Sequence, residues 1–230
     1  MGLIKTPYIF PDPPEGDEEG VVAIGGPMNA ERLLCAYKAG VFPWSGDPVR
    51  WCSPDPRGII WKVRTPRRLG RMFRKGRFEV SFDCAFKEVM QLCAKAHEHE
   101  GVWIKPSFVD AYSELHRMGY AHSVEVWQDG KMAGGLYGVQ IGGLFAGESM
   151  FYHVSNASKI AFVALVYHLA AIGVMLLDCQ MVTEHTEKLG AVWMRREDYL
   201  CLLDEALQAP VRFSGERWPA HGVLDIDLEQ

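Results

Sequence analysis

The fold is decided by the stretch from Gly134 to Gln180, GGLYGVQIGGLFAGESMFYHVSNASKIAFVALVYHLAAIGVMLLDCQ. Its pattern predicts a strand, a tight turn, a second strand, a loop, a helix and a third strand. Glycine readily adopts the positive φ angles that two-residue hairpin turns require, so Gly142-Gly143 predicts the turn between the first two strands. The order of these elements indicates a mixed α+β unit.

The helix of this stretch is expected from about Ala157 to Ala171. Ser155 or Asn156 would cap its beginning, because both side chains can accept a hydrogen bond from a free amide of the first turn. Gly173 follows at the position where a left-handed residue commonly ends a helix. The last segment, residues 174–179, is largely apolar, as is typical of a strand covered on both faces.

Charged and amide side chains are sparse in this apolar block, and three of them fall on its predicted strands: Glu148, Asp178 and Gln180. Asp178 and Gln180 are two positions apart, so they project from the same face of their strand. A carboxylate and an amide at the carboxyl end of a buried strand are costly unless a partner or a reaction uses them. We therefore expect the chemistry of the protein at this point.

The composition is that of an ordinary globular protein. A chain of 230 residues, 48% hydrophobic and 23% charged, can form one large domain or a small domain joined to a medium one. The six cysteines include no C-x-x-C pair, so neither a zinc site nor a disulfide framework is indicated, and a reducing cytosol is the simplest location. Residues 160–177 are long and apolar enough to suggest a membrane span, but Gly173 divides them into a helix and a strand.

Residues 1–56 predict a small N-terminal α+β domain that rests on the remainder of the chain, residues 57–230. Asn29 is a plausible cap for a helix from Ala30 to Ala39, and Gly40 would end it. The segments FPWSGDPVRW and CSPDPRG that follow are rich in turn-forming and aromatic residues. We do not expect so small a module to be stable without support from the larger domain.

Residues 61–78, WKVRTPRRLGRMFRKGRF, concentrate positive charge in a chain whose net charge is −5. Thr65 and Pro66 predict the start of a short helix and Gly76 its end, with the arginines on the outside. A solvated basic face would have the same composition, but this concentration favours contact with phosphate groups. The residues expected at a nucleic-acid backbone are Lys62, Arg64, Arg67, Arg68, Arg71, Arg74 and Lys75.

The C-terminal part has the element order of the acyl-CoA N-acetyltransferases (GNAT-type), which implies a mixed sheet with helices on both faces. An acetyl-CoA enzyme holds the pyrophosphate with a glycine-rich loop at the amino end of its central helix. The corresponding loop here, residues 152–158, contains no glycine. We therefore expect the acetyltransferase-like fold, but with an acyl donor other than acyl-CoA. An acyl group carried on RNA and held by the basic segment would explain both features.

Short motifs occur in order from about Phe10 to Leu200: FPWSGDP, SPDPRG, AHSVEVW, GGLYGV, GESMF, NASK, DCQ and H-x-x-x-LGA. Their combination resembles the leucyl/phenylalanyl-tRNA–protein transferases of the bacterial N-end rule pathway. The resemblance implies transfer of Leu or Phe, and also Met, from aminoacyl-tRNA to an N-terminal Arg or Lys of a protein, which marks that protein for degradation. It also implies a cytoplasmic enzyme without metal or dissociable cofactor. A monomer is the default expectation.

The resemblance assigns roles to the three polar residues. Gln180 would accept a hydrogen bond from the attacking amine, Asp178 would polarise or orient Gln180, and Glu148 would help hold the site. An aminoacyl ester is already activated, and an α-amine with a pKa of about 7.7–8.0 is partly neutral at neutral pH. The site therefore needs only orientation, removal of a proton and support for the developing oxyanion.

The resemblance also predicts an apolar slot for the donor side chain. Periodicity alone would make most of its members plain core residues. The expected members are Leu136, Phe145, Gly147, Met150, Phe162, Leu165, Leu169 and Leu177, with Trp44 and Trp103 near the terminal adenosine and the acceptor entrance. Such a pocket discriminates by about 1–3 kcal/mol per methylene, so β-branched Ile and Val should be disfavoured by shape.

The chain departs from the family pattern at several positions. Leu165 and Leu169 stand where some members carry aromatic residues, which leaves the preference for Leu or Phe open. Tyr152-His153 replaces a Ser-Arg pair after GESMF, which puts local tRNA contacts in question. GGPM and Cys52 also differ from the usual residues.

Two other functions are compatible with the sequence. Cys179 and His185 could form the reactive pair of a thiol acyltransferase or peptidase. Cys179, however, points to the strand face opposite Asp178, and buried cysteine usually serves packing. The second alternative is a non-catalytic module that binds charged tRNA without turning it over. Phosphate contacts release counterions, so binding of this kind would weaken steeply with salt.

Overall fold

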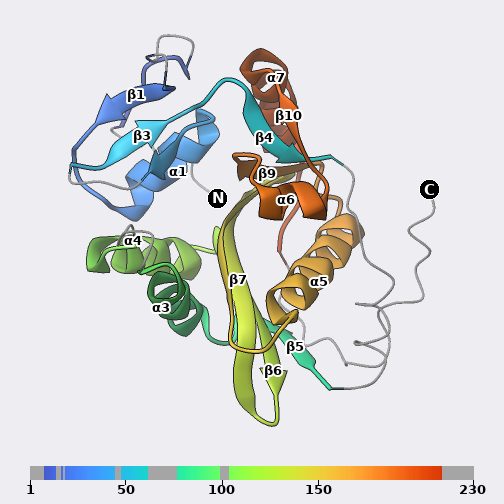
Figure 1. Cartoon of the computed structure of the whole chain (residues 1–230). Coiled ribbons are helices and arrows are strands. Elements are labelled where there is room, and N and C mark those ends of the chain that lie inside the picture. Colours follow the sequence, from blue (N-terminus) through green and yellow to red (C-terminus); the bar gives the residue numbers. More distant parts are fainter. Residues whose placement is uncertain are drawn as a thin grey trace.

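The computed structural model describes residues 8–13, 17, 19–44, 48–61, 77–98 and 104–213. These residues form a mixed α+β structure with one large sheet, one small sheet and helices on both faces of the large sheet (Figure 1). The basic residues predicted to contact RNA, Lys62 through Lys75, lie outside the described residues, and so does Trp103. Among the described residues, no helix is both long and apolar enough to cross a membrane.

The large sheet has seven strands in the order β10-β4-β9-β8-β7-β6-β5. Neighbouring strands are antiparallel except for β8 and β9, which are parallel. The strands are β4 (Arg57–Ile60), β5 (Glu79–Phe82), β6 (Ala121–Gln128), β7 (Lys131–Ile141), β8 (Leu144–Tyr152), β9 (Leu176–Gln180) and β10 (Ala191–Met194).

The stretch that was expected to decide the fold has the predicted order of elements. Strands β7 and β8 form the hairpin, but only Gly142 of its turn has a positive φ, 57°, so the expectation for Gly143 was wrong. Helix α5 (Ala157–Ile172) follows, and Gly173 ends it with a φ of 86°. Strand β9 then returns parallel to β8, pairing Asp178 with Ala146. Asn156 occupies the capping position of α5, but its side chain makes no capping hydrogen bond.

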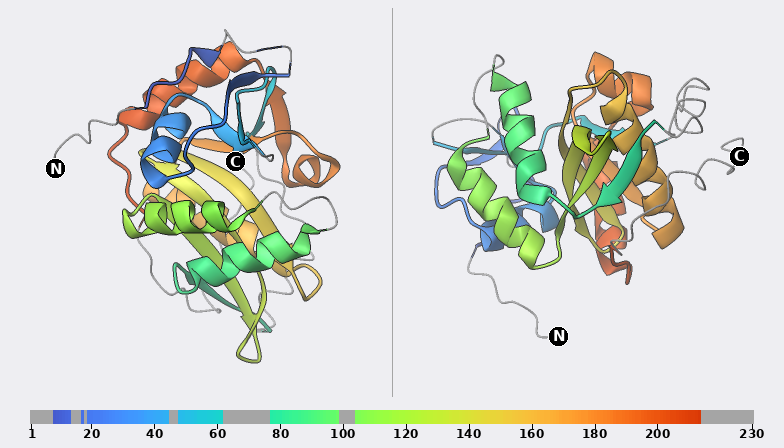
Figure 2. Two further views of the ribbon diagram at one scale, coloured as in Figure 1. Left: turned by 90° about the vertical axis from the view of Figure 1, so that its left-hand side faces the viewer. Right: turned by 90° about the horizontal axis from the view of Figure 1, so that it is seen from below.

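Helices cover the two faces of the large sheet. Helices α3 (Phe86–Ala96) and α4 (Pro106–Arg117) lie on one face and α5 on the other, as the view from below shows (Figure 2). The buried Glu125 of β6 accepts a hydrogen bond from the backbone amide of Ala85 at the start of α3 and another from the hydroxyl of Ser123. The AHSVEVW motif therefore connects the sheet to α3.

The N-terminal part contains α1 (Ala30–Lys38) and a three-stranded sheet of β1 (Val21–Ile24), β3 (Arg50–Cys52) and β2 (Phe42–Trp44). Asn29 caps α1 as predicted, because its side chain accepts the amide of Arg32 at 2.9 Å. Strands β2 and β3 lie in the segments that were expected to be rich in turns. Helix α1 packs against α4, and both contribute to one hydrophobic core. The domain boundary after residue 56 stays a prediction.

The C-terminal part completes the sheet. Helix α6 (Glu184–Leu189) leads into β10, and α7 (Arg196–Gln208) follows. Strand β4 lies between β9 and β10, although it precedes both by more than a hundred residues in the sequence. Gly58 of β4 meets the backbone of Met181 so closely that an added Cβ would lie 2.6 Å from it. This close insertion of β4 places Arg57 beside Asp178.

Candidate active site

A cavity of about 800 Å³ opens between the large sheet, α5 and α6, with β2 contributing to one side. Its apolar wall contains most residues that were predicted to hold a donor side chain. The predicted residues that line it are Trp44, Leu136, Gly147, Met150, Phe162, Leu165 and Leu177. The wall also includes Phe42, Ile60 and Leu189, which the sequence analysis did not single out.

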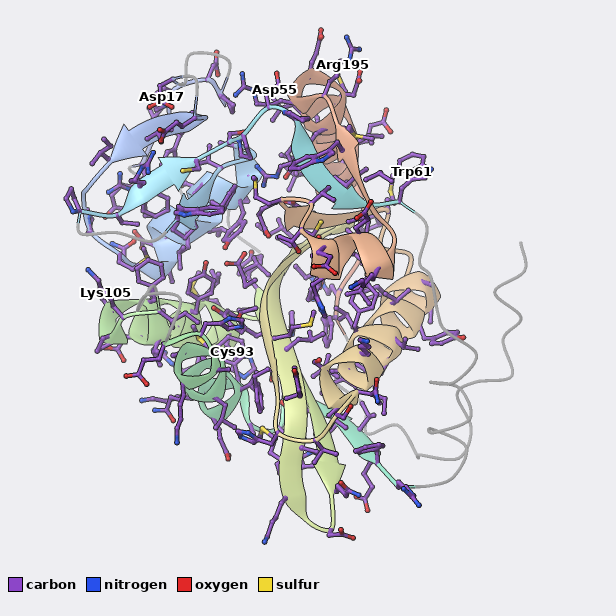
Figure 3. The ribbon with its side chains drawn as sticks, in the orientation of Figure 1. Asp17, Asp55, Trp61, Cys93, Lys105 and Arg195 are labelled. Atoms are coloured by element: carbon purple, nitrogen blue, oxygen red, sulfur yellow. The ribbon has the colours of Figure 1, made fainter. Side chains whose placement is uncertain are left out.

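Two predicted members of the slot are not among the lining residues. Phe145 of β8 and Leu169 of α5 are fully or nearly fully buried in the core between the sheet and α5. Their periodicity therefore reflects packing. Trp44 is 42% exposed at the end of β2, with its ring 5.6 Å from that of Phe42. Trp61 directly follows β4, is 63% exposed, and points away from the molecule (Figure 3).

Asp178 lies at the polar end of the cavity, and both of its carboxylate oxygens are occupied. Arg57 donates to Oδ1 from Nε at 3.0 Å and to Oδ2 from Nη2 at 2.6 Å. The hydroxyl of Tyr199 donates to Oδ2 at 3.0 Å, and the backbone amide of Gln180 donates to Oδ1 at 2.8 Å. Arg57 and Asp178 side chains are each 1% exposed. Asp178 is therefore a buried, bidentate partner of Arg57.

The guanidinium of Arg57 is held on several sides. Its Cζ lies 4.8 Å from the ring centre of Phe42 and 4.5 Å from that of Tyr199. Its Nη1 donates to the carbonyl of Gly40 at 2.9 Å. Burial by itself would lower the pKa of Arg57, but the adjacent Asp178 carboxylate raises it overall. The ion pair thus joins the N-terminal part, β4 and the end of β9.

Gln180 ends β9 in an unusual backbone conformation. Its φ is 59°, a left-handed value that is uncommon for a residue with a side chain. The hydrogen bond from its amide to Asp178 accompanies this turn of the backbone. The side-chain Nε2 lies 3.4 Å from Oε1 of Glu148. Asp178 therefore contacts Gln180 through the backbone, while the Gln180 side chain faces Glu148.

Glu148 of β8 is half-buried and lines the same cavity. The hydroxyl of Tyr112 donates to Oε2 at 3.0 Å, and the hydroxyl of Tyr37 lies 2.5 Å from that of Tyr112. Burial raises the pKa of Glu148 to about 7, although hydrogen bonds from Tyr37 and Tyr112 act in the opposite direction. Burial and the neighbouring Glu148 raise the pKa of both tyrosines well above the ordinary value.

The thiol alternative finds no support in this geometry. Cys179 donates weakly to the carbonyl of Met181 at 3.6 Å, and burial raises its pKa to about 12. His185 instead has its Nε2 at 3.1 Å from the sulfur of Met150. Burial lowers the pKa of His185, and the nearby Lys159 acts in the same direction. No hydrogen bond joins Cys179 to His185 in the part of the chain that the structure describes.

One group of side chains elsewhere has the composition of a metal site. Ligand atoms of Asp83, His116 and His122 lie within 4.8 Å of one another. These atoms already have partners, since Nδ1 of His122 lies 2.8 Å from Asp83 and Nδ1 of His116 lies 2.8 Å from the carbonyl of Ala121. The cluster does not line the cavity.

Four site residues were missed in the sequence: Tyr37, Arg57, Tyr112 and Tyr199. A signal was present for Arg57, because a buried carboxylate at Asp178 requires a cation and Arg57 lies within the quoted SPDPRG motif. No comparable signal marks the tyrosines, which come from helices α1, α4 and α7 and look like ordinary core residues.

Comparisons with known proteins agree with the motifs. Residues 59–204 match the protein family described as Leucyl/phenylalanyl-tRNA protein transferase, and residues 26–55 match its N-terminal domain. A leucyl/phenylalanyl-tRNA–protein transferase of Magnetococcus marinus is 46% identical over 211 residues, 88% of this chain and 90% of the relative. The enzyme of that name from Pseudomonas fluorescens is 46% identical over 199 residues, 84% and 88% of the two chains.

A solved structure of a conserved protein of unknown function from Bacteroides thetaiotaomicron covers 69% of this chain and 57% of its own, at 10% identity and a TM-score of 0.36. That likeness is too weak to bear on the fold. The family match spans well over half of the sequence, and it coincides with the cavity and its polar end. On this evidence the chain belongs to the leucyl/phenylalanyl-tRNA protein transferase family.

Proposed function

We propose that this protein is an aminoacyltransferase that moves Leu, Phe or Met from aminoacyl-tRNA to the α-amine of an N-terminal Arg or Lys, tagging the acceptor protein for degradation. Membership of the family supports the reaction type. The observation that carries the proposal is one cavity in which an apolar wall adjoins Glu148 and Gln180. A donor side chain and an acceptor amine can therefore meet in the same space.

The catalytic domain is proposed to be acetyltransferase-like. Antiparallel strands β6, β7 and β8 followed by α5 and a parallel β9 support this assignment. The glycine-free loop before α5 argues against a CoA donor, because it lacks the open backbone that usually receives a pyrophosphate. The donor is instead carried on RNA. The basic residues 62–75 and Trp103 are proposed to contact it and lie outside the described residues.

The apolar wall is proposed to receive the donor side chain. Leu136, Phe162 and Leu165 present aliphatic and aromatic surface without a charged group, which suits Leu, Phe and Met. A cavity of about 800 Å³ is larger than one such side chain, so the terminal adenosine also has room beside the exposed Trp44. Branching at the β-carbon of Ile or Val would bring a methyl group against the wall.

The polar end is proposed to receive the acceptor. The Gln180 side chain accepts a hydrogen bond from the attacking amine, and Asp178 orients Gln180 through its backbone amide. Glu148 has no cationic partner within salt-bridge distance among the described residues, whereas the charge of Asp178 is matched by Arg57. Glu148 is therefore the carboxylate that attracts a cationic N-terminus.

The decisive experiment combines donors and acceptors in one matrix. Labelled Leu-, Phe-, Met-, Ile- and Val-tRNA are each mixed with peptides that differ only in their first residue. We expect label in peptides that begin with Arg or Lys, from the first three donors, and little from the β-branched ones. A peptide that begins with acetylated Arg is the matched control, because its α-nitrogen is blocked.

The same matrix separates catalysis from mere binding. A non-catalytic module would retain charged tRNA on a filter, with steep salt dependence, and would leave all peptides unlabelled. That outcome would overturn the proposed function. Label in the acetylated peptide would contradict attack by the α-amine.

A further inference from the structure

Two carboxylates line the cavity, and only one of them is available to accept a proton. Asp178 receives two hydrogen bonds from Arg57, one from Tyr199 and one from the Gln180 amide. A proton on either oxygen would displace a donor and leave the buried guanidinium without its anion, which is strongly unfavourable. Asp178 is therefore fully occupied by donor groups of the protein itself.

Glu148 is placed differently. Its Oε2 receives the Tyr112 hydroxyl and the carboxylate also hydrogen-bonds to Tyr37, while the Gln180 amide group lies 3.4 Å from Oε1, a long contact. The residue is half-buried and lines the cavity. Oε1 can accept a further hydrogen bond from a substrate amine without breaking an ion pair within the described part of the protein.

A pair of tyrosines fixes this carboxylate from behind. The hydroxyl of Tyr112 donates to Oε2 of Glu148 at 3.0 Å, and the hydroxyl of Tyr37, which also hydrogen-bonds to Glu148, lies 2.5 Å from that of Tyr112. Both side chains are buried, at 1% and 0% exposure. Tyr37 comes from α1 and Tyr112 from α4, so the N-terminal part of the chain contributes directly to the environment of Glu148.

We propose that Glu148 takes the proton from the attacking amine, and that Tyr112, backed by Tyr37, is the positioning residue that keeps this carboxylate anionic and directed toward the amine. The proposal rests on the proposed function, because it names the proton carrier of that transfer. Asp178 and Arg57 then serve to position Gln180 and take no part in the proton transfer.

The transfer balances without any further reagent. The amine nitrogen forms a bond to the ester carbonyl carbon, and its proton passes to Oε1 of Glu148. The bond from that carbon to the ribose oxygen breaks, and Glu148 returns the proton to the ribose oxygen. The products are the new amide and the free 3′ end of the tRNA, and the carboxylate is restored.

The acidity of Glu148 suits this role. Burial raises its pKa to about 7, near the value of about 7.7–8.0 for an α-amine. Proton transfer between groups of similar pKa is close to balanced and needs little driving force. Among the other groups near Glu148, Asp178 raises this pKa and Arg57 lowers it. Tyr137 is buried on β7 and lines the same cavity, as do His97 and His185.

The test is the pH dependence of single-turnover transfer from Leu-tRNA to a peptide with N-terminal Arg, between about pH 6 and 8.5. Tyr112→Phe removes a hydrogen bond that stabilises the anion, so the acid-side midpoint should move to higher pH. Glu148→Gln should reduce the rate by about 10²–10⁴-fold. The remaining pH dependence of the rate should then reflect only the ionisation of the attacking amine. The peptide is the same throughout, so its own ionisation cancels from every comparison.

Tyr137→Phe is the matched control. Tyr137 is a buried tyrosine close to Glu148, but its hydroxyl has no hydrogen-bond partner in the described structure. Removal of the Tyr137 hydroxyl should leave the acid-side midpoint of the transfer rate equal to that of the wild type. A merely structural role of Tyr112 would lower the rate of Tyr112→Phe without moving the midpoint.

Three results would overturn the inference. The first is a midpoint in Tyr112→Phe equal to that of the wild type, and the second is an unchanged fall of the rate at low pH in Glu148→Gln. The third is the loss of this fall at low pH in Asp178→Asn. Circular dichroism establishes that each variant is folded, and if Glu148→Gln is not, the Tyr112→Phe midpoint decides. Failure of the wild type to transfer at all would instead contradict the proposed function, so the two failures are distinguishable.

Discussion

Asp178 and Glu148 lie in one cavity, yet their surroundings differ in the kind of group that compensates the charge. A cation holds Asp178, with Arg57 sandwiched between the rings of Phe42 and Tyr199. Hydroxyl groups of Tyr37 and Tyr112 hold Glu148, which lines the cavity. The comparison teaches that a buried carboxylate becomes structural when it is paired with a guanidinium and stays able to bind a proton when it is held by neutral donors.

The strongest way to break this contrast is Arg57→Met. The substitution removes the cation and leaves Asp178 buried without a counter-charge, so we expect the free energy of unfolding to fall by about 3–5 kcal/mol. Urea unfolding followed by circular dichroism measures it. Transfer activity should fall as well, because Gln180 depends on Asp178 for its backbone position.

The matched control is Arg195→Met. Arg195 also makes a two-armed pair with an aspartate, Asp198, at 2.9 Å for each arm. Both side chains are largely exposed at the start of α7, where Figure 3 labels Arg195, and neither lines the cavity. Solvent screens exposed pairs, so the unfolding free energy should stay within error of the wild type. Equal losses in the two variants would contradict the structural role given to Arg57.

A smaller effect is expected from Tyr199→Phe, which sharpens the contrast on the side of Asp178. The variant removes one hydrogen bond to a buried carboxylate and should cost about 1.5–3 kcal/mol of stability. Tyr152→Phe, a substitution at a tyrosine that is 63% exposed, is the control for loss of a hydroxyl. The acid-side midpoint of transfer should not move in Tyr199→Phe, and a shift like that of Tyr112→Phe would contradict the assignment of this midpoint to Glu148.

The sequence predicted those parts of the fold that depend on neighbours along the chain. The β7–β8 hairpin, the helix ended by Gly173 and the cap at Asn29 each follow from glycine, capping and apolar spacing within a few residues. The apolar wall was predicted largely through the family resemblance, while Phe145 and Leu169 turned out to be core. Periodicity alone does not distinguish a cavity wall from a packed interior.

The parts that were missed depend on contacts between distant residues. Strand β4 has only four residues, and its place between β9 and β10 is set by pairing across a separation of 121 positions between Arg57 and Asp178. No local pattern records which cation will meet a buried carboxylate. For the same reason, the meeting of Tyr37 and Tyr112, 75 positions apart, was not visible before the helices were packed.

The pH dependence of stability tests Glu148 itself. Its pKa is about 7 in the native state and 4.5 ordinarily, so the native state holds its proton more tightly than the unfolded chain between these values. The contribution to stability is therefore full below about pH 4.5 and is lost as pH rises toward 7. Relative to Glu148→Gln, the wild type should lose about 1–2 kcal/mol between about pH 5 and 8, allowing for screening in the open cavity.

Urea unfolding of both proteins at the two pH values measures this difference, and Glu184→Gln provides the control. Glu184 pairs with Lys188 in solvent, and this hydrogen bond lowers its pKa. It is therefore mostly ionised in both states over this range, and its replacement should change the slope only slightly. If the wild type and Glu148→Gln ran parallel, the carboxylate would already be ionised in the native state at pH 5.

The smallest expected effect concerns Cys179, which lies between Asp178 and Gln180 in the sequence. Burial raises its pKa to about 12, so almost no thiolate exists at neutral pH, and a thiol is a poor nucleophile. Cys179→Ser should therefore keep transfer close to the wild-type rate, with the acid side unchanged. A loss comparable to that of Glu148→Gln would mean that a thioester forms, and acid quenching of a reaction without peptide would then trap labelled Leu on the wild-type protein. Without such a species, the ester of the tRNA is attacked directly, and the two carboxylates account for the polar chemistry of the cavity.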